Sequence, residues 1–379
     1  MHLHNNLQNQ YTEDWLSARD AQQMAFLYAW GPAVFQTARL LVEWGILSAI
    51  DGGASEHSDK CTMHDEVQGL TIDEVAEKTG QSRLSVACLM EAGLTTRILL
   101  IDPETERYRL SKIGWFLLHD EMIHVDQTFC QQVNYEGMFR MDEALRTNQP
   151  VGLEHFGSWP TIYEGLSNLP QPVREAWLNY DHYFSDNSFD EALNIVFATT
   201  KKTLLDIGGN TGEFALKCVQ KDPQVQVTVC DLPQQITMMN QAIAHREGAD
   251  RISGVGMDLL DDNNRFPQQY DAIWMSQFIM CFTEEDILRI LARTKDAMTE
   301  DSRLYLMEVM WNRQAFPSAA FCQTMNSLYF ATMAAGNTKM HSSDEVVALL
   351  HKAGLQVEQI HDNMGPGGHS LMVVKKINE

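Results

Sequence analysis

The sequence has no long hydrophobic run and little positive charge. None of its apolar stretches approaches the roughly 18 uncharged residues that a membrane-spanning helix needs. The N-terminus, MHLHNNLQNQYTEDW, lacks a basic segment followed by an apolar core, so it predicts no secretory signal. Its 28 basic residues are outnumbered by 51 acidic ones, and the resulting formal charge of -23 repels nucleic acid and anionic membranes. We therefore expect a soluble, cytoplasmic protein that binds neither nucleic acid nor a membrane.

Cysteine is sparse, and its spacing argues against the common cysteine-based sites. The seven cysteines are scattered and include no C-x-x-C pair, which predicts reduced thiols and neither a disulfide framework nor a zinc site. His57, Cys61 and His64 lie in a polar stretch that we interpret as a surface loop. Polar loops commonly contain such residues, so we predict no metal site. The 379 residues suffice for two domains with separate cores.

The stretch from Thr203 to Asp231 has the pattern of a nucleotide-binding βαβ unit. An apolar run predicts a buried strand over residues 203–207, glycines at 208, 209 and 212 predict a tight turn, and residues 213–221 have helical spacing. A second β-branched run ends in Asp231, roughly twenty residues after the last glycine. Bare backbone would let a cofactor approach the strand end, and Asp231 could accept hydrogen bonds from two ribose hydroxyls.

Two details make the prediction of a cofactor-binding turn more specific. Asp206 lies two residues before the first glycine, and Asn210 stands where a dinucleotide-binding fingerprint has glycine. A carboxylate at position 206 suits a cationic amino group better than a pyrophosphate. The arrangement Asp206-x-Gly208-x-Asn210-x-Gly212 resembles the first motif of class I S-adenosylmethionine-dependent methyltransferases. The alternative is a structural turn that binds nothing.

Downstream of Asp231, helical and strand patterns alternate, which predicts a doubly wound parallel sheet. Strands are expected over residues 252–257, 270–276 and 303–309, and a hairpin of residues 355–360 and 370–375 is expected to close the sheet. Ligands of such sheets bind at the carboxyl ends of the strands. The residues expected at these ends are Gly208, Asp231, Asp258, Ser276 and Glu308.

The N-terminal half predicts a helical domain. Residues 18–50 have two helical patterns whose apolar residues are too dense for a single buried face, so we expect a dimer interface there. Further on, Thr71 and Gly80 delimit one helix, Ser82 starts another, and two short strands complete a winged-helix pattern. The second helix offers only Arg83 for phosphate contacts, opposed by Glu91. DNA recognition is therefore a remote alternative.

Four motifs, DIGGNTG, DLP, GMDLL and YDAIWMSQ, occur in the order and spacing of the plant-type small-molecule O-methyltransferase family. The winged helix also resembles the N-terminal dimerisation domain of that family. The resemblance implies an α/β fold, with a Rossmann-like class I methyltransferase domain over residues 186–379. A mainly helical, winged-helix dimerisation domain over residues 1–185 would precede it, in a homodimer.

The resemblance also implies the residues that hold S-adenosylmethionine. Asp231 would bind the ribose, Met257 and Asp258 would flank the adenine, and Gly208 would line the methionine part. Ser276 stands where the family usually has a lysine. The implied cofactor set is Asp206, Gly208, Gly209, Asn210, Gly212, Asp231, Leu232, Met257, Asp258, Ser276 and Gln277.

The sequence departs from the family where the catalytic base is expected. Met280 and Cys281 stand where the family has histidine and aspartate, and a methionine thioether cannot usefully accept a proton. Of the two glutamates that bracket the family's histidine, Glu308 matches the first, whereas the second position holds Met340.

Three explanations of this departure remain open. Alignment of the acceptor with the electrophilic methyl group could suffice. His341 or His369, with Glu308, could replace the base. Alternatively, the protein could bind the cofactor without methylating, as a pseudoenzyme or as an enzyme of other chemistry.

Aromatic and methionine side chains are expected to line the acceptor cavity. The loop over residues 152–160 borders the substrate mouth in the family, which makes His155 and Trp159 candidate contacts. Phe278, Met280 and Met325 are candidates from segments expected to wall the cavity. These residues predict a small, hydrophobic, aromatic substrate with a hydroxyl group.

Overall fold

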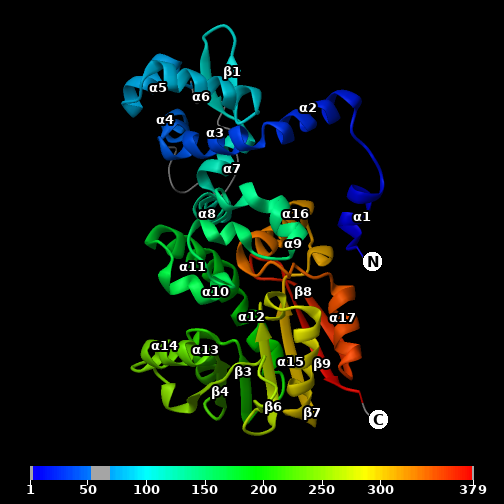
Figure 1. The fold of residues 1–379 in the computed structure, drawn as a ribbon. Helices are drawn as coiled ribbons and strands as arrows, with labels where there is room; N and C mark the ends of the chain where they lie inside the picture. The colour runs from blue at the N-terminus through cyan, green and yellow to red at the C-terminus, as the bar shows by residue number, and fades with distance from the viewer. Residues whose placement is uncertain (1–2, 53–68, 378–379) are drawn as a thin grey trace. The chain divides into compact units, whose positions relative to one another are not determined.

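The computed structural model of the chain describes residues 3–52 and 69–377 (Figure 1). By packing, the chain forms two compact units. The first, here called the N-terminal unit, is Asp14–Thr128, and the second, here called the sheet unit, joins Met1–Glu13 to Phe129–Glu379. The predicted boundary near residue 185 differs from this division. Residues 129–185 belong with the sheet unit because Phe129 and Val133 share a hydrophobic core with Met280.

The polar stretch that contains His57, Cys61 and His64 lies outside the described residues. Within the described ranges, no group of three or more histidine, cysteine or acidic side chains could hold a metal ion. No helix in the same ranges is long and apolar enough to cross a bilayer.

The N-terminal unit contains the predicted winged helix. Thr71 caps α5 in a capping box, and Gly80 ends that helix in the left-handed conformation. Helix α6 continues past Gly93, near which it was expected to end. This glycine instead allows close packing, since a Cβ there would lie 3.0 Å from the Leu41 side chain. The elements are α2 (Ala18–Ala29), α3 (Gly31–Glu43), α4 (Ile46–Asp51), α5 (Ile72–Thr79), α6 (Arg83–Thr95), β1 (Leu99–Asp102), β2 (Arg107–Leu110), α7 (Lys112–His119) and α8 (Glu121–Phe129).

The sheet unit begins with α1 (Asn5–Thr12), which packs against α16 (Pro317–Tyr329). A series of short helices then leads into the sheet. Two segments of the sheet unit, η1 (Cys130–Asn134) and η9 (Phe330–Ala334), are π-helical, a form that often occurs at functional sites. The elements are η1 (Cys130–Asn134), η2 (Gly137–Arg140), α9 (Met141–Thr147), η3 (Val151–His155), α10 (Ile162–Gly165), η4 (Leu166–Asn168), α11 (Gln171–Ser185), η5 (Asp186–Ser188) and α12 (Phe189–Val196).

Seven strands of the described chain form one sheet in the order β5-β4-β3-β6-β7-β9-β8. Strands β3 to β7 are parallel, as predicted, and β9 pairs antiparallel with both β7 and β8. The chain reverses its direction of winding between β3 and β6, which is where doubly wound sheets bind ligands. The strands are β3 (Thr203–Ile207), β4 (Gln226–Asp231), β5 (Ile252–Gly256), β6 (Tyr270–Ser276), β7 (Met298–Glu308), β8 (Leu355–Met364) and β9 (His369–Lys376).

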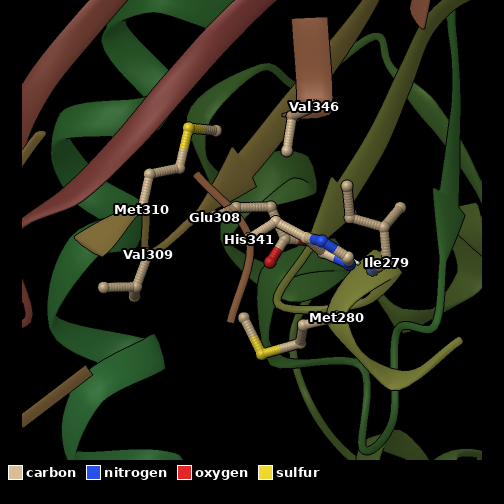
Figure 2. A pocket seen from close by; sticks show the side chains of 7 residues that line it. All are labelled: Ile279, Met280, Glu308, Val309, Met310, His341 and Val346. Atoms are coloured by element: carbon tan, nitrogen blue, oxygen red, sulfur yellow. Dashed lines mark hydrogen bonds between the residues drawn. The ribbon is translucent and has the colours of Figure 1, made fainter. Parts of the chain in front are cut away.

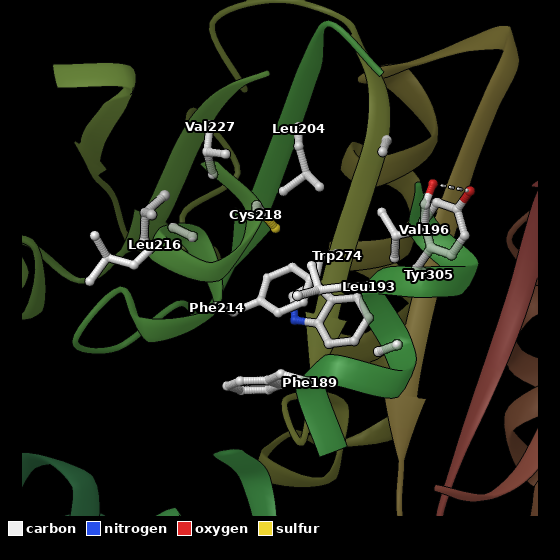
Figure 3. Packing of buried hydrophobic residues seen from close by; sticks show 14 of the residues in the cluster. Phe189, Leu193, Val196, Leu204, Phe214, Leu216, Cys218, Val227, Trp274 and Tyr305 are labelled. Atoms are coloured by element: carbon white, nitrogen blue, oxygen red, sulfur yellow. Dashed lines mark hydrogen bonds between the residues drawn. The ribbon is translucent and has the colours of Figure 1, made fainter. Parts of the chain in front are cut away.

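Helices cover both faces of the sheet. Side chains alternate between the faces, so Leu204 packs toward α12, α13 and α14, whereas Leu205 packs toward α15 and α17. On the first face, Trp274 stacks on Phe214 with ring centroids 3.9 Å apart (Figure 3). The remaining elements are α13 (Glu213–Lys221), α14 (Pro233–Ile243), η6 (Ala249–Arg251), η7 (Ile279–Cys281), α15 (Glu284–Asp296), η8 (Trp311–Arg313), η9 (Phe330–Ala334) and α17 (Ser343–Lys352).

Replacing Trp274 tests whether this face stabilises the sheet unit. Because the indole is 1% exposed, Trp274→Ala should reduce the free energy of unfolding by about 3–5 kcal/mol, measured by circular dichroism in urea. Met238→Ala on the exposed side of α14 is the control and should change it by less than about 0.5 kcal/mol. Equal effects of the two substitutions would contradict the packing.

Candidate cofactor and acceptor site

The glycine turn after β3 is shaped by backbone that most residues avoid. Gly208, Asn210 and Gly212 have φ of +75°, +46° and +82°. Asparagine tolerates this left-handed region better than other side chains do, which explains how Asn210 replaces a glycine. A Cβ on Gly208 would lie 2.4 Å from the ring of Phe278. Position 208 of the turn therefore requires bare backbone, which only glycine provides.

Asp231 ties this turn to the end of β4. Its two carboxylate oxygens accept hydrogen bonds from the backbone N–H groups of Asn210 at 3.0 Å and Leu232 at 2.7 Å. Burial raises the pKa of Asp231, while these two hydrogen bonds oppose the rise. The lone pairs that remain on the carboxylate can accept further donors.

Asp206 lies on β3, beneath the turn. Its carboxyl group is buried and its Oδ2 has no hydrogen-bond partner. Burial, and then repulsion by Asp231, raise the pKa of Asp206 to about 8. The hydroxyl of Ser276, at the end of the neighbouring strand β6, is also buried without a partner. Unsatisfied polar atoms beside a bare-backbone cradle fit a cofactor that has an amino group and hydroxyls.

The other residues of the implied cofactor set follow the same strand ends. Met257 donates its N–H to the carbonyl of Asp231 at 2.9 Å. Asp258 is exposed and accepts the N–H of Leu260 at 2.8 Å. Gln277 adopts a φ of +49°, which turns the chain at the end of β6. The structure thus brings the set to one edge of the sheet.

Glu308 organises the loop after β6. Its Oε1 accepts the N–H groups of Phe278 and Ile279, each at 3.0 Å, and its Oε2 is buried without a partner. Burial raises the pKa of Glu308 to about 8, although the two hydrogen bonds act in the opposite direction. One oxygen therefore holds the loop and the other is available.

A small cavity lies beside Glu308 and is lined by His341 and Met280, among others (Figure 2). The space open to the centre of a water molecule is ≈ 10 Å³, close to the room that one water needs. The lining residues are Ile279, Met280, Glu308, Val309, Met310, His341 and Val346.

His341 is 8% exposed and neither ring nitrogen has a partner. It directly precedes Ser342, the N-cap of α17. Burial, followed by the nearby Lys339, lowers the pKa of His341. The lowered pKa favours the neutral imidazole, which can accept a proton.

The expectation that His369 projects into the same site does not match the structure. Glu308 pairs with Ser370 in the sheet, so the preceding residue, His369, faces the opposite side. There His369 Nδ1 lies 3.0 Å from the Ser188 hydroxyl. Burial lowers the pKa of His369 to about 4. His369 is thus buried and is not among the residues that line the cavity, and its Nε2 has no hydrogen-bond partner.

The predicted acceptor residues divide into two groups. Phe278 lies against the glycine turn and Met280 lines the cavity. The other three are not among the lining residues: His155 is paired with Glu136, Met325 is 43% exposed, and Trp159 packs its ring against the backbone of two glycines.

Sequence reasoning missed the contact of Tyr163 with Cys281. The phenol donates a hydrogen bond to the sulfur at 3.2 Å, and burial raises the pKa of the Cys281 thiol to about 12. Cys281 is thus a neutral thiol and no nucleophile. The two residues are 118 positions apart, and no local pattern signals such a contact.

The buried carboxyl of Asp206 predicts a pH dependence of stability. Between its unfolded pKa near 4 and its folded pKa of about 8, the folded state binds more protons, so stability falls as pH rises. Asp206→Asn should remove a decline of about 1 kcal/mol for each pH unit in this range. Urea unfolding between pH 5 and 8 measures it. Parallel declines in the wild type and the variant would contradict a protonated Asp206.

The chain matches known methyltransferases in sequence. The O-methyltransferase domain family matches residues 187–356, and the Dimerisation2-like domain family matches residues 22–108. The L-tyrosine C(3)-methyltransferase of Streptomyces lavendulae is 25% identical over 81% of this chain and 84% of its own length. The demethylspheroidene O-methyltransferase of Rhodobacter capsulatus is 26% identical over 75% of this chain and 68% of its own length.

Solved structures show the same fold. The S-adenosylmethionine-dependent methyltransferase SibL in its apo form has a TM-score of 0.68 and 20% identity, over 93% of this chain and 98% of its own. Mitomycin 7-O-methyltransferase has a TM-score of 0.65 and 19% identity, over 94% of this chain and 98% of its own. The chain therefore combines an O-methyltransferase domain with a preceding Dimerisation2-like domain, the two kinds of domain that the sequence predicts.

Proposed function

We propose that the protein transfers the methyl group of S-adenosylmethionine to a hydroxyl oxygen of a small, apolar aromatic molecule. The observation that carries this proposal is the glycine turn between the carboxyl groups of Asp206 and Asp231, at the switch point of the sheet. Such an arrangement offers separate partners for an amino group and for ribose hydroxyls.

The residues at the strand ends have separate roles in this proposal. Asp231 accepts the ribose hydroxyls, Met257 and Asp258 flank the adenine, and Gly208 admits the methionine part. When bound, S-adenosylmethionine supplies an electrophilic methyl carbon on a sulfonium. The cationic cofactor also favours the ionised form of Asp206, whose free oxygen has no partner in the protein.

The acceptor proposal rests on aromatic side chains around Met280. Phe129 stacks on Tyr180 with ring centroids 4.1 Å apart, and Trp177 donates its indole N–H to the hydroxyl of Tyr329 at 2.8 Å. All four belong to one hydrophobic cluster with Met280. A flat, apolar acceptor would pack well against such aromatic side chains. An aromatic acceptor is also supported by the relatives of this chain, which include a 3-amino-4-hydroxybenzoate 4-O-methyltransferase and a 3-hydroxy-5-methyl-1-naphthoate 3-O-methyltransferase.

A second candidate is methylation of a ring carbon beside the hydroxyl. Supporting it, the Streptomyces lavendulae relative, matched over 84% of its length, is a C(3)-methyltransferase of tyrosine. Isotope-labelled methyl groups distinguish the two, because a methoxy carbon and an aryl methyl carbon have separate NMR shifts in the product.

Cofactor binding tests the proposal through Asp231. Calorimetric titration with S-adenosylmethionine and S-adenosylhomocysteine should show binding by the wild type. Asp231→Ala should weaken it by at least ~100-fold, the value of two charge-assisted hydrogen bonds. Asp250→Ala changes an exposed acid in η6 and is the control, with unchanged affinity expected. Absence of binding by the wild type would refute the proposed function.

We also propose that the chain is a cytoplasmic homodimer that associates through the N-terminal unit. The match to the Dimerisation2-like domain family supports this. Helix α2 has no buried residue, and Phe26, Tyr28 and Trp30 are 58%, 72% and 67% exposed. Large aromatic side chains this exposed are typical of protein interfaces.

Sedimentation velocity tests the dimer. The double substitution of Phe26 and Trp30 by aspartate should convert dimers to monomers at micromolar concentration, because burying two carboxylates in an apolar interface is costly. Met238→Asp, on an exposed position of the sheet unit, should leave the dimer intact. A wild type that sediments as a monomer would disprove the assembly.

A further inference from the structure

Two polar side chains share the cavity beside the loop after β6. His341 has two unpartnered ring nitrogens, Glu308 has one unpartnered oxygen, and the other five lining residues are apolar. Buried polar atoms in folded proteins normally have hydrogen-bond partners. Three such atoms at one small cavity therefore indicate that the cavity binds a polar group of a ligand.

The size and position of the cavity specify that group. Its space of ≈ 10 Å³ for a water centre admits one oxygen-sized group. Ile279 and Met280 line it, and Phe278, which precedes them, packs its ring against Gly208. Two residues that line the cavity therefore come directly after the residue that touches the glycine turn. A hydroxyl oxygen would fill it.

Other candidate proton acceptors near this loop are unsuitable. Met280 has no basic atom, the thiol of Cys281 is neutral and bonded by Tyr163, and His369 lies on the opposite sheet face. Glu308 is mainly protonated at pH 7, since burial raises its pKa to about 8. His341 remains.

Burial lowers the pKa of His341 more than the charged groups around it change that pKa in either direction. Lys339 lowers the pKa of His341, Glu345 and Glu284 raise it, and burial, which lowers it, is the largest influence. Lys339 and Glu345 are themselves paired at 2.7 Å. The N-terminus of α17, which His341 adjoins, also disfavours a cation there.

We propose that His341 is the general base of the methyl transfer and that Glu308 is its positioning residue; this rests on the proposed function. The O–H bond of the acceptor breaks, an N–H bond forms on the imidazole of His341, and the electron pair stays on the acceptor oxygen for the incoming methyl carbon. The free carboxyl oxygen of Glu308, which lines the same cavity, would orient the ring through a hydrogen bond once the acceptor is bound. The proton passes to solvent when the product leaves.

The test compares His341→Ala, Glu308→Gln and the control His351→Gln, which changes an exposed histidine in the last turn of α17. Calorimetry with S-adenosylhomocysteine first establishes that each variant retains the cofactor site. Release of S-adenosylhomocysteine is then measured with a panel of phenols and naphthols from 4-methoxyphenol to 4-nitrophenol. The wild type, the three variants, and His341→Ala with added imidazole are each assayed across pH 5 to 9.

His341→Ala should lose ~10²–10⁴-fold in kcat on weakly acidic phenols but much less on 4-nitrophenol, which ionises unaided. Added imidazole should restore part of the loss. Glu308→Gln should shift the pH profile, and His351→Gln should behave as the wild type.

A uniform loss across the panel without rescue, or full activity of His341→Ala, would overturn the inference while leaving the methyltransferase proposal standing. If the wild type binds the cofactor but methylates no acceptor of the panel, the proposed function fails and the inference fails with it.

Discussion

Carboxylate hydrogen bonds to backbone N–H groups at the carboxyl ends of the strands are the interaction on which this site depends. Asp231 holds the glycine turn through Asn210, and Glu308 holds the next loop through Phe278 and Ile279. Both acids end strands of the parallel sheet, whose strands necessarily finish at one edge. Fixing the loops in this way places the turn, the cavity and its polar atoms on neighbouring segments.

Acidic side chains are costly to bury, so the buried acids of this site are informative about function. Asp206 and Glu308 each have an oxygen without a partner and a pKa of about 8. A fold that needed only stability would replace them with apolar residues of similar volume. Local violations of good packing are expected at functional sites, where a ligand completes the interactions.

Much of the sheet could be predicted from the sequence because its signals are local. The strand from Thr203 to Ile207 and the helix from Glu213 to Lys221 have the predicted bounds, since apolar runs and glycines delimit them. The position of Asn210 in the turn could also be predicted from the sequence. Long-range features were not: whether His369 faces Glu308 depends on the register of β9 on β7, and a shift of one residue changes the face.

Tertiary packing explains the remaining differences between the structure and the expectations from the sequence. Gly93 looked like a helix end but serves close contact with Leu41. The cavity joins residues from the loop after β6, the end of β7 and the start of α17, and no sequence spacing relates these segments. Their proximity follows only from the strand order.

The most direct measurement is a crystal structure of the complex with S-adenosylhomocysteine. We expect both ribose hydroxyls to bind Asp231, the amino group to lie on the side of Asp206, and the sulfur to face the cavity of Met280, Glu308 and His341. A ligand bound elsewhere, or a sulfur directed away from that cavity, would contradict this expectation.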